Sequence, residues 1–415
     1  MNPKRLKIFI SAYACEPKKG SEPGIGWNVC KELAKYHEIH VLTRANNREV
    51  IEDALRGHTE SVPFFHYYDL PKWASFWKKK KRGYRFYYYL WQFGAFFHYR
   101  KWVNSFGFDI VQHLTFANIA IPSLFMMCRK PMTIYGPIGT TPIPPAIFRA
   151  LPFKIKIREL LRKWSMELLI HLEPFRVQTT KCADWIIECG RISGKSCFPN
   201  RFHNKIRLHP QTGINTEEPE YRCIRQRRED GKVRLLICSE FLHWKGVTFS
   251  CETFARIARK RDDVELVIYG SGPEKSAMKK ILADAGVSDR ARFMGFVSKI
   301  EMVQALFDAD ILLYPSYHHG LATIILQAMY AKLPIVALKD DSIGQTVSEG
   351  GGVVAEGDSM KEVLDDLERK TERLIDSAEL RRTLGENGRK RIAEQYEWRI
   401  LTRKLSDLLV ELAGR

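Results

Sequence analysis

Short apolar runs alternate with amphipathic stretches along most of the chain. The first such unit joins an apolar run, Leu6 to Ala12, to a helical pattern from about Trp27 to Lys35 and a second run, Glu38 to Thr43. Buried parallel strands are continuous apolar runs, and helices connect them. The pattern therefore predicts a βαβ unit at the start of the chain.

The same alternation continues through the first half. We predict strands in 63–70, 108–114, 131–138 and 182–190, the last being the final strand of this half, and a long amphipathic helix from about Lys154 to His171. The segment 204–219, with a turn at Gly213, is predicted to be a linker.

The pattern then restarts. Val233 to Cys238 is a predicted strand, and further strand and helix pairs lead to the stretch Asp310 to Ala337. That stretch predicts a strand at Ile311–Tyr314, a loop, a helix over 322–331 and a strand over 334–338. Ligands bind at the carboxyl ends of strands in such sheets. Two successive alternations predict an α/β protein with two doubly wound domains facing a cleft.

We predict a first domain over 1–212, a second domain over 213–390 and a C-terminal helix over 391–415. The chain from Lys361 to Arg415 is helical and charged in pattern, and we expect its end to cross back to the first domain.

The composition indicates that the protein has an acidic partner. The 415 residues are 45% hydrophobic and 27% charged, as in an ordinary globular protein, but carry a formal net charge of +18. Such a charge favours nucleic acid, an anionic membrane or a phosphorylated substrate.

The segment 71–102 concentrates this charge. It interleaves Lys78 to Arg82 with aromatic residues such as Trp73, Trp77 and Trp91. Cations among amphipathic aromatics suit an anionic bilayer surface, and they would also suit single-stranded nucleic acid, which we favour less. The third interpretation is that the aromatic side chains belong to the core and that the lysine run is a solvated surface.

Other classes of protein are disfavoured. The nine cysteines show no CxxC pair, which indicates reduced thiols in the cytosol rather than a zinc site or disulfide framework. The apolar start is better interpreted as a first strand than as a signal peptide. Ile110 to Cys128 lacks charge, but polar residues and Pro122 interrupt it, so we expect a buried strand and a short helix instead of a membrane span.

Candidate chemistry lies at strand ends. Gly20, Gly24 and Gly26 form a predicted glycine-rich turn that could approach a phosphate or a sugar, with a plain tight turn as the alternative. The nicotinamide fingerprint GxGxxG is absent from this turn. His113 ends a predicted strand, where it could contact a ligand or be a satisfied structural histidine.

Several motifs together resemble one family. In chain order they are "CEPKKGSEPGIGWN", "YGPIGTTPIPP", "QTGIN", "HWKGV", "VIYGSGPE", "RFMGF" and "PSYHHGLATIILQAMYAKLPIVA". This order and spacing resemble glycosyltransferase family 4 (group 1), the retaining nucleotide-sugar transferases with the GT-B fold. The resemblance implies an acceptor-side first domain, a nucleotide-sugar-binding second domain and a C-terminal helix that returns to the first.

The family implies roles for individual residues. His113 and Lys245 would be catalytic: His113 near the reacting carbon of the donor sugar, and Lys245 on the donor diphosphate. The implied donor-binding residues are Gly24, Gly26, Glu240, Gly270, Gly272, His318, His319, Gly320, Leu321, Ala322, Thr323 and Gln327. No metal site is implied.

Three positions depart from the family pattern. His319 and Gln327 occupy the places of two customary glutamates, and Glu240 that of a customary arginine. A charge-assisted hydrogen bond contributes about 1.5–3 kcal/mol against about 0.5–1.5 for a neutral one, so Gln327 predicts weaker ribose binding. A carboxylate at 240 should repel a diphosphate unless it points away or a cation such as His243 or Arg234 compensates.

The resemblance implies a retaining hexosyltransferase that moves a sugar from a nucleotide-diphospho-sugar to a cell-surface polysaccharide or lipid-linked acceptor. It needs no cofactor, and its partners would be the donor, a glycan or lipid-linked acceptor and an anionic membrane surface, with no nucleic acid. The expected location is cytoplasmic, with peripheral attachment at the inner membrane face. The alternative is a degenerate, non-catalytic member that binds sugar nucleotide, glycan or a partner transferase. A nicotinamide oxidoreductase ranks behind both.

Overall fold

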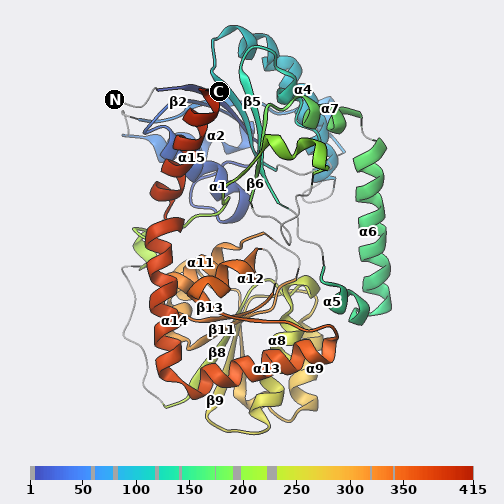
Figure 1. The fold of residues 1–415 in the computed structure, drawn as a ribbon, viewed down its shortest axis with the longest axis vertical. Helices are drawn as coiled ribbons and strands as arrows, with labels where there is room; N and C mark the ends of the chain where they lie inside the picture. Colours follow the sequence, from blue (N-terminus) through green and yellow to red (C-terminus); the bar gives the residue numbers. More distant parts are fainter. Residues whose placement is uncertain are drawn as a thin grey trace.

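A computed structural model gives the fold of the chain (Figure 1). It describes residues 5–57, 61–77, 83–116, 121–139, 143–172, 174–189, 198–221, 231–317, 320–339 and 342–414. Two α/β bodies stack along the long axis of the molecule, one from each half of the sequence.

Each half contains one parallel sheet, and the two sheets share a strand order. The first has the order β3-β2-β1-β4-β5-β6-β7, and the second has the order β10-β9-β8-β11-β12-β13. The strands of the first sheet are β1 (Lys7–Ala12), β2 (Glu38–Thr43), β3 (Phe64–Tyr67), β4 (Ile110–Thr115), β5 (Met132–Ile138), β6 (Trp185–Glu188) and β7 (Ile206–Leu208). Those of the second are β8 (Val233–Cys238), β9 (Val264–Tyr269), β10 (Ala291–Gly295), β11 (Ile311–Tyr314), β12 (Ile335–Leu338) and β13 (Gly352–Ala355). In both sheets the chain winds outward from a central strand in two directions, which is doubly wound topology.

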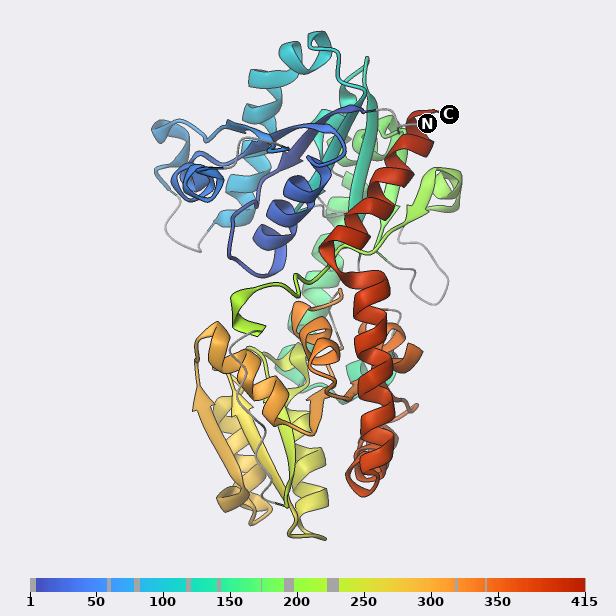
Figure 2. The ribbon, with the colours of Figure 1, turned by 90° about the vertical axis from the view of Figure 1, so that its left-hand side faces the viewer.

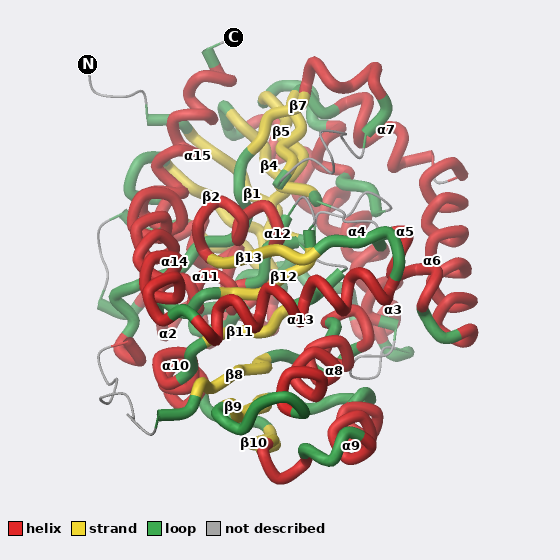
Figure 3. The backbone as a smooth tube through the Cα atoms, turned by 60° about the horizontal axis from the view of Figure 1, so that its bottom comes forward, coloured by secondary structure: helices red, strands yellow, loops and turns green. Residues whose placement is uncertain are grey.

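Helices cover both faces of each sheet (Figure 3). In the first half they are α1 (Ser21–Leu33), α2 (Arg48–Leu55), α3 (Lys72–Ser75), α4 (Tyr84–Ser105), α5 (Pro145–Ala150), α6 (Phe153–Leu172) and α7 (Pro174–Cys182). In the second they are α8 (Val247–Ala258), α9 (Lys275–Asp284), α10 (Lys299–Asp308), α11 (Thr323–Tyr330), α12 (Ile343–Thr346), α13 (Met360–Asp376), α14 (Ala378–Arg391) and α15 (Trp398–Ala413). The described strand interiors are buried except in the edge strands β3, β7, β10 and β13 and at Glu265 of β9.

The last helix crosses between the halves. α14 packs in the second half, and α15 continues along the same side of the molecule to the first (Figure 2). Trp398, Leu401 and Leu405 of α15 are buried in the core that α1, β1 and β2 form. The predicted fold class, two doubly wound domains with a returning C-terminal helix, is confirmed.

A second crossing runs the other way. Ile147 and Leu151, from the segment between β5 and β6, are buried in the core of the second half. The Arg149 guanidinium donates to the Asp358 carbonyl oxygen at 3.2 Å. The sequence does not predict this excursion, because nothing local in 143–172 distinguishes a helix of one half from a helix docked on the other.

The predictions for the start of the first helix, for the linker and for the last strand of the first sheet are corrected. The first helix begins at Ser21 rather than Trp27, so Gly24 and Gly26 lie in its opening turns and not in a loop. The predicted linker 204–219 contains a strand, β7, so β6 is not the last strand of the first sheet. Propensity alone disfavours glycine in a helix, but tertiary contacts override it here.

The segment 71–102 divides into core and surface. Tyr87, Tyr88 and Trp91 of α4 are buried in the first half, whereas Trp73 and Phe76 are each 78% exposed. The lysine and arginine run from Lys78 to Arg82 lies outside the described residues. Within the described chain, no helix combines the length and hydropathy that crossing a bilayer would require.

Candidate active site

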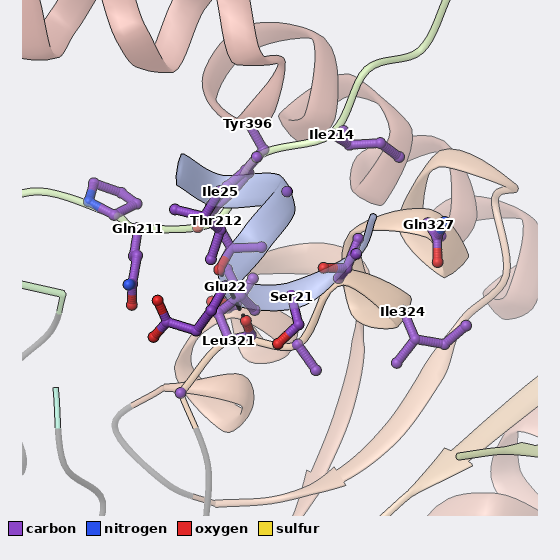
Figure 4. A pocket seen from close by; sticks show the side chains of 18 of the residues that line it. Ser21, Glu22, Ile25, Gln211, Thr212, Ile214, Leu321, Ile324, Gln327 and Tyr396 are labelled. Atoms are coloured by element: carbon purple, nitrogen blue, oxygen red, sulfur yellow. Dashed lines mark hydrogen bonds between the residues drawn. The ribbon is translucent and has the colours of Figure 1, made fainter. Parts of the chain in front are cut away.

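A cleft of about 1250 Å³ opens between the two halves. Its walls come from the start of α1 and the 208–215 connection on one side, and from the carboxyl ends of β8 and β11 and the start of α11 on the other (Figure 4). Of the predicted site residues, those that line it are Gly24, Glu240, Lys245, Gly320, Leu321, Ala322, Thr323 and Gln327. The cleft is therefore where the carboxyl ends of the second sheet predict a ligand.

The loop after β11 is tied to the turn that carries Lys245. The Ser316 hydroxyl and the Tyr317 amide both donate to the Trp244 carbonyl oxygen, at 3.1 and 3.0 Å. Gly246 has a φ of +65°, and a Cβ there would lie 2.1 Å from the Pro315 carbonyl oxygen. Only glycine allows both this backbone conformation and this close approach. The two loops therefore form one unit beneath the cleft.

Lys245 is the central cation of this unit. It ends a short 3-10 turn (His243–Lys245), and its Nζ donates to the Tyr314 hydroxyl at 2.9 Å. Burial lowers the pKa of Lys245 to about 8, and the carboxylate of Glu240 acts in the opposite direction. A half-buried ammonium that faces a cleft can bind an anion strongly, because less solvent screens its charge than at an open surface.

Glu240 does not point away from the cleft. It is exposed, lines the cleft wall and is close enough to raise the pKa of Lys245. The prediction that Arg234 or His243 compensates for the charge of Glu240 is wrong. Arg234 is held by Glu265 and by the Asp308 carbonyl oxygen, and His243 is buried against Glu159. Neither side chain is among those that line the cleft.

Gly270 and Gly272 lie behind the cleft wall. Their φ angles are +126° and +155°, and a Cβ would lie 1.9 Å from the Ser239 carbonyl oxygen at the first and 2.6 Å from that of Phe241 at the second. They let the turn after β9 pack against the end of β8, although neither is among the residues that line the cleft. Their direct contact with a donor stays a prediction.

The start of α11 lines the cleft. Ala322 precedes it in extended conformation, and no side chain caps this end. The backbone of Gly320–Thr323 lines the cleft beside it, and Gln327 follows one turn later with 6% of its surface exposed. Gln327 contacts Tyr221, whose pKa burial raises. His318 and His319 lie outside the described residues.

The glycines of α1 serve close packing. A Cβ on Gly24 would lie 2.1 Å from the Lys19 carbonyl oxygen, and one on Gly26 would lie 2.2 Å from that of Ala14. Gly24 lines the cleft, and Gly26 is buried beneath it. The two residues bring the helix start against the chain that leaves β1.

His113 does not reach the cleft lining. It is 1% exposed, and its Nε2 lies 3.0 Å from the Tyr88 hydroxyl. Burial lowers its pKa to about 4, so the imidazole is neutral at pH 7. The Nε2 atom thus has a partner, whereas the buried Nδ1 makes no hydrogen bond with the described residues. The catalytic role of His113 stays a prediction.

Sequence reasoning missed the polar groups on the first half's side of the cleft. Glu22 lies there beside Gln211 and the Leu321 backbone (Figure 4). Its Oε2 accepts from the Phe116 amide at 3.1 Å, and burial raises its pKa. Thr212 donates to the Leu321 carbonyl oxygen at 3.0 Å, which joins the connection between the halves to the donor-side loop. A carboxylate inside a glycine-rich motif was the available signal for Glu22.

The described residues contain no group of three His, Cys, Asp or Glu side chains placed to hold a metal ion.

A family comparison agrees with this geometry. Residues 223–391, which include the Lys245 turn, the α11 loop and the second sheet, match the family described as glycosyl transferases group 1. This part of the chain is a group 1 glycosyltransferase domain. The predicted likeness to group 1 glycosyltransferases is thereby confirmed for residues 223–391, which include Lys245 and Gln327.

Curated relatives match over part of their length. The chain is 29% identical over 153 residues to the alpha-D-kanosaminyltransferase of Streptomyces kanamyceticus, covering 37% of this chain and 39% of that protein. It is 30% identical over 175 residues to the MMP alpha-(1->4)-mannosyltransferase of Mycolicibacterium hassiacum, covering 41% of each. It is 29% identical over 211 residues to a GDP-mannose-dependent alpha-(1-6)-phosphatidylinositol monomannoside mannosyltransferase of Mycobacterium tuberculosis, covering 48% of this chain and 54% of the relative. The chain thus spans about half or less of these relatives' length.

Solved structures share the whole architecture. Sucrose-phosphate synthase from Thermosynechococcus elongatus superimposes with a TM-score of 0.63 at 15% identity, covering 99% of this chain and 100% of that one. WaaG, a glycosyltransferase involved in lipopolysaccharide biosynthesis, gives 0.60 at 15% identity, with coverage of 97% and 99%. Anabaena HepE in complex with UDP gives 0.60 at 12% identity, with coverage of 98% and 100%. Together with the two parallel sheets, this likeness shows that the glycosyltransferase domain is the second half of a GT-B fold.

Proposed function

We propose that the protein is a retaining glycosyltransferase that moves a sugar from a nucleotide-diphospho-sugar to a cell-surface polysaccharide or lipid-linked acceptor. The observation that carries the proposal is that the half-buried Lys245 ammonium and the start of α11 line the same cleft. A cation and a helix N-terminus converge there, as a departing diphosphate requires.

The donor would bind against the second half. Its diphosphate would lie between Lys245 and the amides of Gly320–Thr323, and its ribose near Gln327. As the sugar–phosphate bond breaks, negative charge grows on the leaving oxygen, and Lys245 stabilises it more than it stabilises the ground state. The leaving phosphate then accepts the proton of the acceptor hydroxyl, which attacks on the same face.

The acceptor would bind against the first half. We infer that Glu22 faces it, because this half-buried carboxylate lies across the cleft from the donor-side loop. Its Oε2 is engaged by the Phe116 amide, which fixes the direction of the side chain. Glu22 would thus position an acceptor hydroxyl rather than act as a nucleophile.

Membrane contact by the first half is part of the proposal. Trp73 and Phe76 expose 78% of their surface, next in sequence to the Lys78–Arg82 run. Aromatic and basic side chains together suit the interface of an anionic bilayer. A lipid-linked acceptor would be reached from that surface.

The competing function is a degenerate member that binds a sugar nucleotide without transfer. Glu240 favours it, since a carboxylate in the cleft wall beside Lys245 opposes a diphosphate.

A transfer assay separates the two functions. Purified full-length protein is incubated with UDP- and GDP-sugars and candidate glycan and lipid-linked acceptors, and nucleotide release is followed with the anomeric configuration of the product. Release with retention supports the proposal. Measurable donor binding without release under any pairing would instead favour the degenerate member, and inversion would reject the retaining mechanism.

A further inference from the structure

Helix α6, which belongs to the first half by its place in the chain, contacts the turn that carries Lys245. It lies between β5 and β6, and both strands are part of the first sheet. It runs along the side of the molecule from α5, beside the second half, to α7 on the first (Figure 1). Ile155, near its start, packs against the core of the second half. A segment of the first half therefore reaches the wall of the donor side.

Glu159 makes the contact with that turn. It is 6% exposed, its Oε1 lies 3.3 Å from the His243 Nε2, and its Oε2 accepts from the Arg162 guanidinium at 2.7 Å. The Arg158 guanidinium donates to the His243 Nδ1 at 3.0 Å. A guanidinium can only donate, so Nδ1 is the acceptor and Nε2 carries the proton that it shares with Glu159. Burial lowers the pKa of His243 and the Arg158 charge adds to this effect, whereas Glu159 and Glu274 oppose it.

His243 and Lys245 are the two ends of one short turn. The 3-10 turn spans three residues, His243–Lys245, and hydrogen bonds close it on both sides. The Lys245 amide donates to the Leu242 carbonyl oxygen at 2.9 Å, and the Gly246 amide donates to that of His243 at 3.1 Å. The loop after β11 holds the middle of the turn through the Trp244 carbonyl oxygen, and Glu159 holds its start. A shift of His243 is therefore transmitted to the backbone of Lys245.

The chemistry of this contact suits orientation better than stability. Burying a carboxylate costs free energy that its partners only partly return, and apolar residues of similar volume often stabilise a protein equally well. A buried carboxylate with fixed donors instead specifies one geometry. Both Glu159 oxygens are engaged, one by the turn and one by its own helix, so the carboxylate fixes the distance between α6 and His243.

We propose that Glu159 is a positioning residue for Lys245, and that it acts through His243 to keep the ammonium facing the cleft. A helix of the first half thereby sets the direction of the cation in the second half. The inference rests on the proposed function in one respect, namely that Lys245 binds the diphosphate of the donor.

The test measures the binding of inorganic pyrophosphate, which has neither the nucleoside nor the sugar of a donor. Isothermal titration calorimetry on the full-length protein gives the Kd at pH 7, in the absence of divalent cations. E159A should weaken binding by about tenfold, because the turn loses one of its two supports. E159Q keeps an oxygen that accepts from the His243 Nε2, so its Kd should stay within about threefold of the wild-type value.

The pH dependence of the same Kd supplies a second measurement. Lys245 has a pKa of about 8 because of burial, which the charge of Glu240 opposes, and its Nζ contacts the Tyr314 hydroxyl. A displaced Lys245 is more solvated, so in E159A the pH at which affinity is lost should rise by about one unit. The titration of pyrophosphate itself is common to all variants, and only differences between variants count.

A double-mutant cycle distinguishes positioning from general stability. If Glu159 acts through Lys245, E159A should change nothing further in K245Q. E265A is the matched control, because Glu265 is a half-buried carboxylate held by Arg234 and is not among the residues that line the cleft. It should lower the melting temperature and leave both the Kd and its pH dependence unchanged. Circular dichroism establishes that each variant is folded.

Four outcomes would overturn the inference. They are a wild-type Kd and pH dependence in folded E159A, an equal loss on adding E159A to K245Q, an equal loss in E265A, and no pyrophosphate binding by the wild type. The absence of sugar transfer produces none of these outcomes. A failure of the proposed function in the transfer assay is therefore distinguishable from a failure of the role of Glu159.

Discussion

The two halves of the chain share a strand order but present different surfaces. Both sheets wind outward from a central pair, β1 with β4 and β8 with β11. In the described part of the second half, the large exposed apolar side chains are Met294, Phe296 and Ile300, whereas the first half exposes many more, mostly on α3, α4 and α6. The half-buried Lys245 belongs to the second half. One fold thus supports a half arranged around a charged ligand and a half with surfaces suited to a larger partner.

The largest expected effect tests the charged site of the second half. K245Q removes the half-buried cation, and loss of one group that stabilises developing negative charge costs about 10²–10³ in kcat. The assay is nucleotide release from the donor, with melting temperature as the check on folding. K299Q is the control, since Lys299 also lines the cleft but is paired with Glu218 at 2.6 Å. Equal losses in both variants would contradict a special role for Lys245.

The second prediction concerns the packing of the first half at the cleft. G24A would place a Cβ 2.1 Å from the Lys19 carbonyl oxygen, so the helix start must shift. We expect the free energy of unfolding to fall by about 2 kcal/mol in denaturant titrations. G20A is the matched control, because a Cβ at Gly20 meets nothing within 4 Å. A loss of similar size in G20A would show that glycine flexibility, and not close approach, matters.

The third prediction uses pH. Lys245 has a pKa of about 8 in the folded protein, below its ordinary value of 10.5, because burial disfavours the charged form. It is charged below that pH, so kcat/KM for the donor should fall by about tenfold between pH 8 and pH 9.5 as the ammonium is lost. K245R should remain charged across this range. A profile that falls equally in K245R would assign the pH dependence to another group.

The lowered pKa of Lys245 affects stability in the opposite direction to activity. Between pH 8 and pH 10.5 the unfolded chain binds more protons at this lysine than the folded chain. The contribution of Lys245 to the free energy of unfolding therefore rises with pH in that window. In this pH window kcat/KM should fall while the contribution of Lys245 to the free energy of unfolding rises. Urea titrations of wild type and K245Q measure that contribution at each pH.

The smallest expected effect belongs to Glu22. E22Q keeps an acceptor for the Phe116 amide but loses the charge, and we expect about a fivefold lower kcat/KM for the acceptor with the donor KM unchanged. E22A should lose more, because the amide is left without its partner. The measurement is initial rate against acceptor concentration. A changed donor KM would place Glu22 on the donor side of the cleft and weaken the contrast between the halves.

The two halves also differ in how well their site residues could be predicted from the sequence. Lys245, Gly320 and Gln327 were predicted because their motifs resemble those of a glycosyltransferase family, and all three line the cleft. Glu22 was missed because its importance depends on the Phe116 amide, 94 residues away in sequence. His113 was predicted from the same resemblance, but it is buried, and its Nε2 contacts the Tyr88 hydroxyl of α4.

The sequence by itself determined the two alternations of strand and helix, the fold class and the donor-side motifs. The alternations and the fold class follow from local periodicity, since apolar runs must be buried and each strand needs a covering helix. The donor-side motifs were identified by their resemblance to a glycosyltransferase family. Only the tertiary structure decided that α5 joins the core of the opposite half and that α6 contacts the turn that carries Lys245. Both depend on contacts such as Glu159 with His243, which are 84 residues apart, and no local pattern encodes a pairing at that separation.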